Sequence, residues 1–229
     1  MHSAAPAVPG TRVCQLRDLG QIEYGRALEV QRALVEKRKR GLVPDQLLIV
    51  EHPHTITLGR NGSSDHLLAN EDVLRRAGIA FFPTDRGGDI TYHGPGQLVG
   101  YPILDLRDWR RDVVAYVRTI EQAIIGTLAD FGIDAGREPG MTGVWVDGRK
   151  IAAIGVHIGR WITSHGFALN VTTDLRYFQY IVPCGLAKPV TSIEAELGAA
   201  PERPELIESF AHHFSELFGL DTAVPEEAL

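Results

Sequence analysis

Apolar and polar positions along the chain follow two spacings, one expected of helices and one expected of strands. The most regular helical spacing lies in the middle of the chain, where apolar residues recur every three or four positions along one face. Asp108 or Asp112 would cap the start of this helix, and Gly132 would end it. Its expected inward face consists of Val113, Tyr116, Val117, Ile120, Ile124, Leu128 and Phe131.

Three other segments carry helical patterns. Residues 22–39 form one, and a run of four basic residues, 37–40, stands at its end. Residues 71–77 form a short one with Asn70 as its N-cap. Residues 204–218 form the last, and its expected inward side chains are Leu206, Phe210, Phe214 and Leu217.

Strand-like runs fill much of the remaining sequence. Residues 143–146 and 150–158 flank Asp147-Gly148, and Asp-Gly between two such runs is a strong hairpin signal. Strands and helices do not alternate regularly, which favours a single α+β domain, a mixed β-sheet flanked by helices. Further strands are expected at 12–16, 46–51, 55–58, 79–83, 98–103 and 161–170.

One stretch, residues 86–97, is rich in glycine. It holds four glycines, a proline, an arginine and a histidine, and a predicted strand follows it. Glycine permits close backbone approach and positive φ angles, so this stretch suits a wall that lies against a ligand. An ordinary surface loop is the alternative. The Tyr, His, Pro and Gln beside the glycines favour binding, because loops on a rigid sheet concentrate binding residues.

Composition excludes several classes of protein. With 229 residues, the chain can bury a sizeable core as one domain or two small ones. The net charge of -6 argues against a nucleic-acid binder, which would be basic. No apolar run approaches the roughly 20 residues that span a bilayer, and no signal peptide is visible, so no membrane is expected as a partner.

The two cysteines, Cys14 and Cys184, do not make a disulfide framework and indicate a reducing compartment, with the cytoplasm as the expected location. Cys14 sits in an apolar strand pattern and fits the usual role of a small buried hydrophobe. Cys184 lies between Pro183 and Gly185, a setting that suits an accessible thiol. Near pH 7 only about 3% of an ordinary thiol is thiolate, so a nucleophilic Cys184 needs a neighbouring cation or base.

Lys150, His93, His157 and His165 are candidates for that neighbour. A lysine that points from an apolar strand into a pocket loses hydration, which makes it a credible general base. A solvated lysine just past a turn is the alternative for Lys150. A thiol activated in this way would carry out acyl transfer through a thioester.

Metal and nucleotide chemistry have less support. His52, His54, His93 and Cys184 could supply ligands to zinc, but the sequence has no HExxH or CxxC spacing, and no metal site is expected. There is also no GxxxxGK[ST], no GxGxxG and no Gly-x-Ser-x-Gly elbow. A nucleotide-binding protein and a serine hydrolase are therefore disfavoured.

Four segments together resemble the lipoyl(octanoyl) transferase family, the octanoyl-[acyl-carrier-protein]:protein N-octanoyltransferases of lipoate biosynthesis. The segments are RGGDITYHGPGQ at 86–97, GRKIAAIG at 148–155, HGFALNV at 165–171 and PCGL at 183–186. They occur in the family's order. Phe167 stands where the family often has leucine, which is a mild apolar change.

The resemblance implies a fold shared with the catalytic domains of lipoate and biotin protein ligases. It makes residues 11–222 the octanoyltransferase catalytic domain. Residues 1–10, rich in Ala and Pro, are expected to be disordered, and 223–229 form an acidic C-terminal tail. Cys184 would carry the acyl group, and Lys150 would lower the pKa of the thiol and shuttle protons. The implied substrate-binding residues are Arg86, Gly87, Gly88, Asp89, Ile90, Thr91, Tyr92, His93, Ala153, Ile154, Gly155, Gly166, Phe167 and Ala168.

By the same resemblance, Cys184 takes octanoyl from the phosphopantetheine thioester of acyl carrier protein and passes it to a specific lysine of an apo lipoyl domain. Such domains belong to 2-oxoacid dehydrogenase E2 subunits and to glycine cleavage H protein. No cofactor is implied beyond the carrier's phosphopantetheine, because exchange between thioesters needs no ATP. Both partners are generally acidic, so docking would need a basic patch, with candidates at Arg107, Arg110 and Arg111, or at 37–40.

Finer expectations and rival functions complete the sequence picture. Val99, Ile154 and Phe167 would line an acyl tunnel, with ordinary sheet core as an equal alternative. Backbone N–H groups of Gly185 or Leu186 would stabilise the oxyanion. The rivals are an ATP-dependent lipoate or biotin ligase, a cysteine amidase or thioesterase, and a lipoyl-domain-binding module with an inert cysteine.

Overall fold

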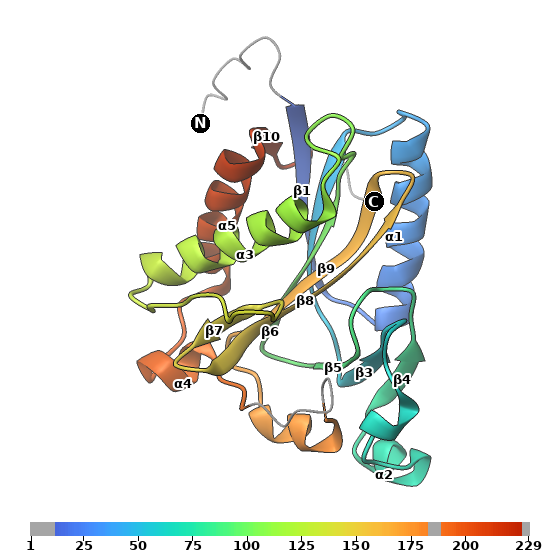
Figure 1. The fold of residues 1–229 in the computed structure, drawn as a ribbon, viewed down its shortest axis with the longest axis vertical. Coiled ribbons are helices and arrows are strands. Elements are labelled where there is room, and N and C mark those ends of the chain that lie inside the picture. Colours follow the sequence, from blue (N-terminus) through green and yellow to red (C-terminus); the bar gives the residue numbers. More distant parts are fainter. Residues whose placement is uncertain (1–11, 183–188, 226–229) are drawn as a thin grey trace.

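The structure is a computed structural model and describes residues 12–182 and 189–225. Cys184, Gly185 and Leu186 therefore lie outside the described residues, as does the N-terminal segment 1–10 that the sequence predicts to be disordered. The described chain forms two β-sheets with helices packed against them (Figure 1).

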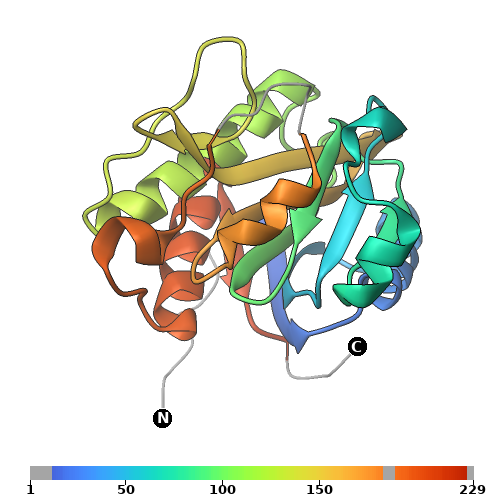
Figure 2. The same ribbon diagram turned by 90° about the horizontal axis from the view of Figure 1, so that it is seen from below.

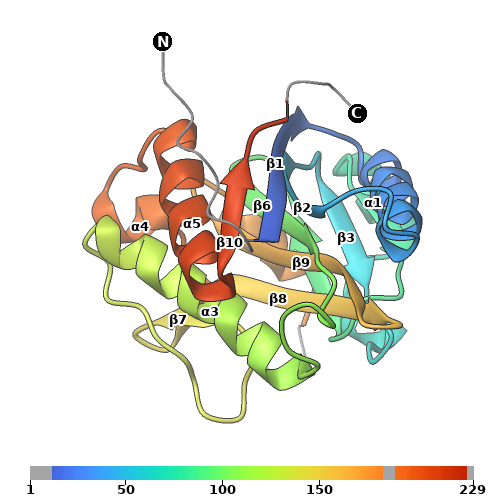
Figure 3. The ribbon, with the colours of Figure 1, turned by 90° about the horizontal axis from the view of Figure 1, so that it is seen from above.

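The larger sheet has seven strands. In chain order they are β1 (Arg12–Gln21), β2 (Asp45–Glu51), β6 (Gln97–Ile103), β7 (Val144–Val146), β8 (Arg149–Gly159), β9 (Ile162–Asn170) and β10 (Leu220–Ala223). Their order in the sheet is β10-β1-β2-β6-β9-β8-β7. β1 lies parallel to β2 and β10, whereas the other pairs are antiparallel, so the sheet is mixed as predicted. Seen from above, β10 lies beside β1 at the sheet edge (Figure 3).

Helices cover both faces of this sheet (Figure 1). On one face lie α3 (Val113–Asp130) and α5 (Arg203–Phe218), preceded in the chain by the short α4 (Ile193–Leu197). On the other lies α1 (Tyr24–Lys39). Strand β2 is apolar on both sides because it separates the two cores. Leu47 and Ile49 belong to the α3–α5 core, and Leu48 and Val50 belong to the α1 core.

A second, three-stranded sheet was not part of the sequence prediction. Its strands are β3 (Thr55–Leu58), β4 (Ala80–Pro83) and β5 (Ile90–His93), in the order β4-β3-β5. The glycine-rich stretch, predicted as a loop, therefore contains a strand. Ile90 and Tyr92 of that strand share a small core with Ile56.

Short helical elements close the lower side of the molecule, as the view from below shows (Figure 2). They are η1 (Ser64–His66), α2 (Glu71–Arg76) and η2 (Leu175–Tyr180). The turn η2 contacts β5, and an isolated bridge between Leu67 and Ile181 ties the chain just after η2 to the chain just after η1. The segment that leads toward Cys184 is thus fixed to the smaller sheet.

Local sequence signals located most element ends correctly. Asn70 caps α2, with its Oδ1 accepting the N–H of Val73 at 3.0 Å. Asp112, and not Asp108, caps α3. The hairpin at Asp147-Gly148 is confirmed, with φ angles of 47° and 74°, the positive values that a two-residue I′ turn requires.

Three predicted details are wrong. Val113, predicted to lie on the inward face of the central helix, is 46% exposed at the first position of α3. The first strand runs on from the predicted 12–16 as far as Gln21. Leu217, predicted to face inward, is 38% exposed, whereas Phe218 is 1% exposed. The buried face of α5 steps by four residues from Leu206 through Phe210 and Phe214, and the next step reaches Phe218.

The connection between the two sheets contains a buried histidine, His52, which is 0% exposed. Its Nδ1 lies 2.7 Å from the carbonyl oxygen of Ile22, which can only accept, so Nδ1 carries the proton. Its Nε2 lies 2.7 Å from the hydroxyl oxygen of Tyr101 and accepts a hydrogen bond from that hydroxyl group. Burial lowers the pKa of His52 to about 4, so the ring is neutral near pH 7.

This histidine makes the stability of the fold depend on pH. The unfolded chain takes up a proton near pH 6.5, but folded His52 does so only near pH 4, so acid favours the unfolded state. We expect His52 to account for a loss of about 2 kcal/mol in the free energy of unfolding between pH 7 and pH 5.

The matched variant is His52→Gln, whose amide can donate to Ile22 and accept from Tyr101 without titrating. Urea denaturation of both proteins at pH 7 and pH 5 measures the effect, and the variant should lose less stability on acidification. Equal losses in the two proteins would contradict a neutral, buried His52.

Candidate active site

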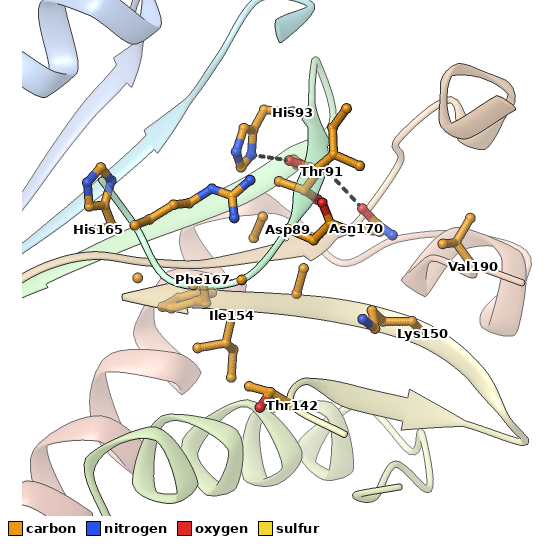
Figure 4. A pocket seen from close by; sticks show the side chains of 18 of the residues that line it. Asp89, Thr91, His93, Thr142, Lys150, Ile154, His165, Phe167, Asn170 and Val190 are labelled. Carbon is orange, nitrogen blue, oxygen red and sulfur yellow. Dashed lines mark hydrogen bonds between the residues drawn. The ribbon is translucent and has the colours of Figure 1, made fainter. Parts of the chain in front are cut away.

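A cavity of about 460 Å³ lies between the β8–β9 pair and the glycine-rich stretch. Figure 4 looks into it, with Lys150 and Val190 at one end and His165 at the other. Its walls come from segments far apart in the chain, at 86–97, 140–145, 150–155 and 165–170. Three of the four segments on which the family resemblance rests therefore converge at one place.

Most of the predicted substrate-binding residues line this cavity, and only Gly87 and Tyr92 do not. Gly87 connects the glycine-rich stretch to β8, since its N–H donates to the carbonyl oxygen of Val156 at 2.8 Å. Tyr92 packs in the small core, with its hydroxyl 2.7 Å from Nδ1 of His54. Lining fixes position only, so the roles of these residues in binding substrate stay predictions.

Arg86 fastens the glycine-rich stretch to the smaller sheet. Its Nη2 donates to the carbonyl oxygen of Thr57 at 2.7 Å, and its Nε donates to the Thr57 hydroxyl at 3.1 Å. The neighbouring Asp85 accepts a hydrogen bond from Nε2 of His165 at 2.8 Å. Burial lowers the pKa of His165, although the carboxylate of Asp85 opposes that shift. The stretch is therefore held to β3 on one side and to β8 and β9 on the other.

Two glycines allow backbones to pass closely at the cavity wall. A Cβ on Gly166 would collide with the carbonyl oxygen of Gly100 on the neighbouring strand. A Cβ on Gly155 would lie 2.8 Å from the carbonyl oxygen of Gly87. Any side chain at either position would push a strand or the glycine-rich stretch outward. The close approach of the backbones therefore requires glycine at both positions.

A chain of hydrogen bonds crosses the cavity wall (Figure 4). Nδ1 of His93 lies 3.2 Å from Oε1 of Gln97, Gln97 donates to Oδ1 of Asn170 at 3.0 Å, and Asn170 donates to the carbonyl oxygen of Thr191 at 2.9 Å. The N–H of Thr191 donates in turn to the carbonyl oxygen of Lys150 at 2.9 Å. Burial, together with the charge of Arg86, holds the pKa of His93 well below its usual value, so His93 is neutral.

These contacts distinguish the four candidates for activating the thiol. His93 is engaged in the hydrogen-bond chain, and His165 is paired with Asp85 at the far end of the cavity. His157 does not line the cavity. Lys150 lines the cavity and is partly buried, so its side chain is not fully exposed to solvent.

The backbone of Lys150 is fixed from both sides. Strand β7 pairs with it through Trp145, and on its other side its N–H donates to the carbonyl oxygen of Pro189 at 2.9 Å. Pro189 and Val190 are the first described residues after Cys184, and Val190 lines the cavity. Before Cys184, the N–H of Val182 donates to the carbonyl oxygen of His66 at 2.9 Å.

Cys184 itself lies outside the described residues, so its pairing with Lys150 stays a prediction. The same holds for an oxyanion site at Gly185 or Leu186. The other cysteine, Cys14, is 0% exposed in the α3–α5 core, as predicted, and burial raises the pKa of its thiol.

The sequence missed several residues that line the cavity. Gln97 and Asn170 belong to the matching segments and could have been found from them. The others carry no distinct sequence signal. They are Tyr24, Tyr101, Gly140, Met141, Thr142, Trp145, Phe178 and Val190.

The predicted acyl tunnel needs one correction. Val99 is 0% exposed and packs in the α1 core, so for this residue the alternative of ordinary sheet core is right. Side chains alternate along β6, and the register of Val99 directs it toward α1. Ile154 and Phe167 do line the cavity.

Neither a metal-binding cluster nor a membrane-spanning helix is present in the described part of the chain. Within residues 12–182 and 189–225, no group of three or more His, Cys, Asp and Glu side chains could hold a metal ion. The rings of His52 and His93 meet edge to face, with centroids 5.9 Å apart, and His54 stacks on Tyr177. None of the helices in the described part of the chain is long and apolar enough to cross a membrane.

Sequence comparisons identify the relatives of this chain. The family model described as the lipoyl protein ligase A/B catalytic domain matches residues 23–215. An octanoyltransferase from Solibacter usitatus (strain Ellin6076) is 67% identical over 92% of this chain and 95% of that protein. An octanoyltransferase from Acidobacterium capsulatum is 51% identical over 90% of this chain and 91% of that protein.

Solved structures agree about the fold. A bipartite lipoate protein ligase from Thermoplasma acidophilum has a TM-score of 0.76 at 18% identity, covering 93% of this chain and 87% of that one. Biotin protein ligase from Aquifex aeolicus has a TM-score of 0.56 at 12% identity, covering 89% of this chain and 70% of that one. These likenesses confirm the predicted α+β fold. Because the family model and both octanoyltransferases match most of its length, the chain belongs to the lipoyl protein ligase A/B catalytic domain family, and within it to the octanoyltransferases.

Proposed function

We propose that the protein takes octanoyl from acyl carrier protein onto Cys184 and passes it to a specific lysine of an apo lipoyl domain. The expected acceptors are 2-oxoacid dehydrogenase E2 subunits and glycine cleavage H protein. The observation that carries this proposal is the cavity, which combines apolar walls with the amine of Lys150 beside the chain that flanks Cys184. A catalytic thiol also needs a reducing compartment, which favours the cytoplasm.

In the first half-reaction, the amine of Lys150 accepts the thiol proton of Cys184, and the sulfur bonds to the carbonyl carbon of the octanoyl thioester. The bond from that carbon to the phosphopantetheine sulfur then breaks. The phosphopantetheine thiolate that leaves then takes this proton from Lys150. One thioester replaces another, so the exchange balances without ATP or any other co-reactant.

In the second half-reaction, the acceptor lysine attacks the carbonyl carbon of octanoyl-Cys184. Lys150 removes a proton from the attacking nitrogen and delivers one to the departing sulfur of Cys184. The product is an amide, which is more stable than the thioester it replaces. The same amine therefore takes up and releases a proton in both halves of the cycle.

The acyl chain would lie along β8 and β9, beside Ile154, Phe167 and Ala168. Lys150 and Gly155 are five residues apart on β8, a span of about 17 Å at ~3.3 Å per residue. That span exceeds the length of an octanoyl group. Burying the tail would contribute roughly 5 kcal/mol to binding, at about 0.8 kcal/mol for each CH₂ group.

The basic candidates for partner docking are largely engaged within the protein. Arg38 is paired with Asp45 at 2.8 Å, where it joins the end of α1 to β2. Arg107 is paired with Asp105 at 2.5 Å, and Arg110 with Asp112 at 2.9 Å. These pairings reduce the charge available to an acidic partner, so docking on either patch stays an open proposal.

The acyl-enzyme is the most direct test. Incubation with octanoyl-acyl carrier protein should add one octanoyl group to the intact protein, as measured by mass spectrometry. Cys184→Ala should abolish the addition, because it removes the attacking sulfur. Cys14→Ala is the matched control and should react at the wild-type rate, since Cys14 is 0% exposed. Octanoylation that persists in Cys184→Ala would refute the intermediate.

Lys150→Ala should keep the fold but slow octanoylation of Cys184 by at least about 100-fold near pH 7, the usual lower range for loss of a general base. The rate should recover in part at higher pH, where the thiol ionises unaided. Single-turnover acylation measured from pH 6 to pH 9 tests this. A wild-type rate across that range would rule out the pairing of the amine with the thiol.

Transfer can be separated from the rival activities with isolated octanoyl-enzyme. Added apo lipoyl domain should gain the octanoyl group on one lysine in the absence of ATP, detected by peptide mass spectrometry. A thioesterase or amidase would instead release octanoate at the same rate without the acceptor. An ATP-dependent ligase would modify the domain only from free octanoate and ATP, and Cys184→Ser would leave that reaction intact.

A further inference from the structure

The amine of Lys150 lies over the face of a buried indole ring. Its Nζ is 4.7 Å from the centroid of the Trp145 ring, within the range of a cation–π contact. The ring face carries partial negative charge, so it attracts an ammonium group more strongly than a neutral amine. The ring of Trp145 therefore lies where it would favour the charged form of Lys150.

Trp145 is held too firmly for this contact to be accidental. The side chain is 3% exposed, and the residue is paired with Lys150 across β7 and β8. Its N–H and its carbonyl oxygen both bond to Gly136, at 2.9 and 2.8 Å. The backbone of Trp145 is thus fixed by hydrogen bonds, and its buried ring presents one face to the amine.

The stem of Lys150 is confined as well. A Cβ on Gly143 would lie 3.5 Å from Cε of Lys150, so the lysine runs along this glycine. The N–H of Gly143 donates at 3.0 Å to Glu121, whose carboxylate is fully buried and paired with Arg137 at 2.9 Å. The methylene chain of Lys150 therefore lies against Gly143, and its amine lies against Trp145.

We propose that Trp145 is a positioning residue for Lys150, which stabilises the ammonium form through the face of its ring while the lysine holds the proton taken from Cys184. The inference rests on the proposed function, because it assumes that Lys150 carries this proton. Without the ring, the ammonium would form less readily, and the thiol would lose its proton acceptor near pH 7.

Among the described residues, the other charged groups near Lys150 have partners of their own. Arg149, the preceding residue on β8, pairs with Glu196 at 2.9 Å, and with Asp147 at 3.8 Å. Across the cavity, Asp89 pairs with His66 at 2.5 Å. Arg86 lines the same cavity and is bonded to Thr57, and His93 there is neutral.

The test measures the titration of Lys150 directly. Brief competitive acetylation at a series of pH values, read by peptide mass spectrometry, gives the midpoint at which this amine becomes reactive, with the exposed Lys37 as internal reference. In Trp145→Leu the midpoint should fall by about one pH unit, the shift that corresponds to a buried cation–π contact. In Trp145→Tyr, which keeps an aromatic face, it should fall less.

A fluorinated series removes the question of folding. Tryptophan carrying one, two or more fluorine atoms keeps its shape, but its ring face becomes less negative. Placed at position 145, it should lower the Lys150 midpoint stepwise, and the octanoylation rate at pH 7 should fall in the same order. The same analogues at Trp109, which packs on Phe218 with centroids 4.9 Å apart, are the control and should change neither quantity.

The outcomes distinguish the two proposals. A Lys150 midpoint that does not move with fluorination overturns the role of Trp145, whatever Lys150 does in catalysis. If the midpoint moves but Lys150→Ala acylates at the wild-type rate, the contact is present and the proposed function of Lys150 has failed.

Discussion

Close backbone contact between the glycine-rich stretch and the β8–β9 pair is the constraint on which the site depends. At Gly155 the two segments approach so nearly that a Cβ would lie 2.8 Å from the carbonyl oxygen of Gly87. The N–H of Gly87 bonds to β8 at Val156, while Arg86 reaches back to Thr57 in the smaller sheet. One short stretch thus joins the two sheets and forms a wall of the cavity between them.

This arrangement decides where charge can reside. Burial keeps His52 and His93 neutral, and each is engaged by hydrogen bonds that use its ring nitrogens. His165 is hydrogen-bonded to Asp85, and this bond supports the start of the glycine-rich stretch. The histidines around the cavity are therefore engaged within the fold, which leaves Lys150, among the described residues that line the cavity, as the proposed proton acceptor.

Features set by neighbours in the chain were predictable, and features set by distant packing were not. The Asp147-Gly148 turn and the Asn70 cap depend on local backbone geometry, so short patterns sufficed to predict them. The smaller sheet was missed because β5 pairs with β3 across more than thirty residues. Val99 faces α1 for a similar reason, since register within the sheet decides its side. At the site, family segments supplied the glycines and Lys150, but only the folded hairpin shows Trp145 beneath the amine.

The fold does not choose the chemistry by itself, because a biotin ligase crystallised with ATP shares it at 12% identity. A ligase must first activate a free acid, whereas a thioester arrives already activated. What thioester exchange needs is a group that gains and loses a proton twice in each cycle, and such a group works best when its two forms are close in free energy. Burial of Lys150 in the cavity wall would disfavour its ammonium form, whereas the face of Trp145 would favour it. Under the proposal for Trp145, these opposed effects bring the two forms of the amine closer in free energy, which is the condition that the proposed exchange requires.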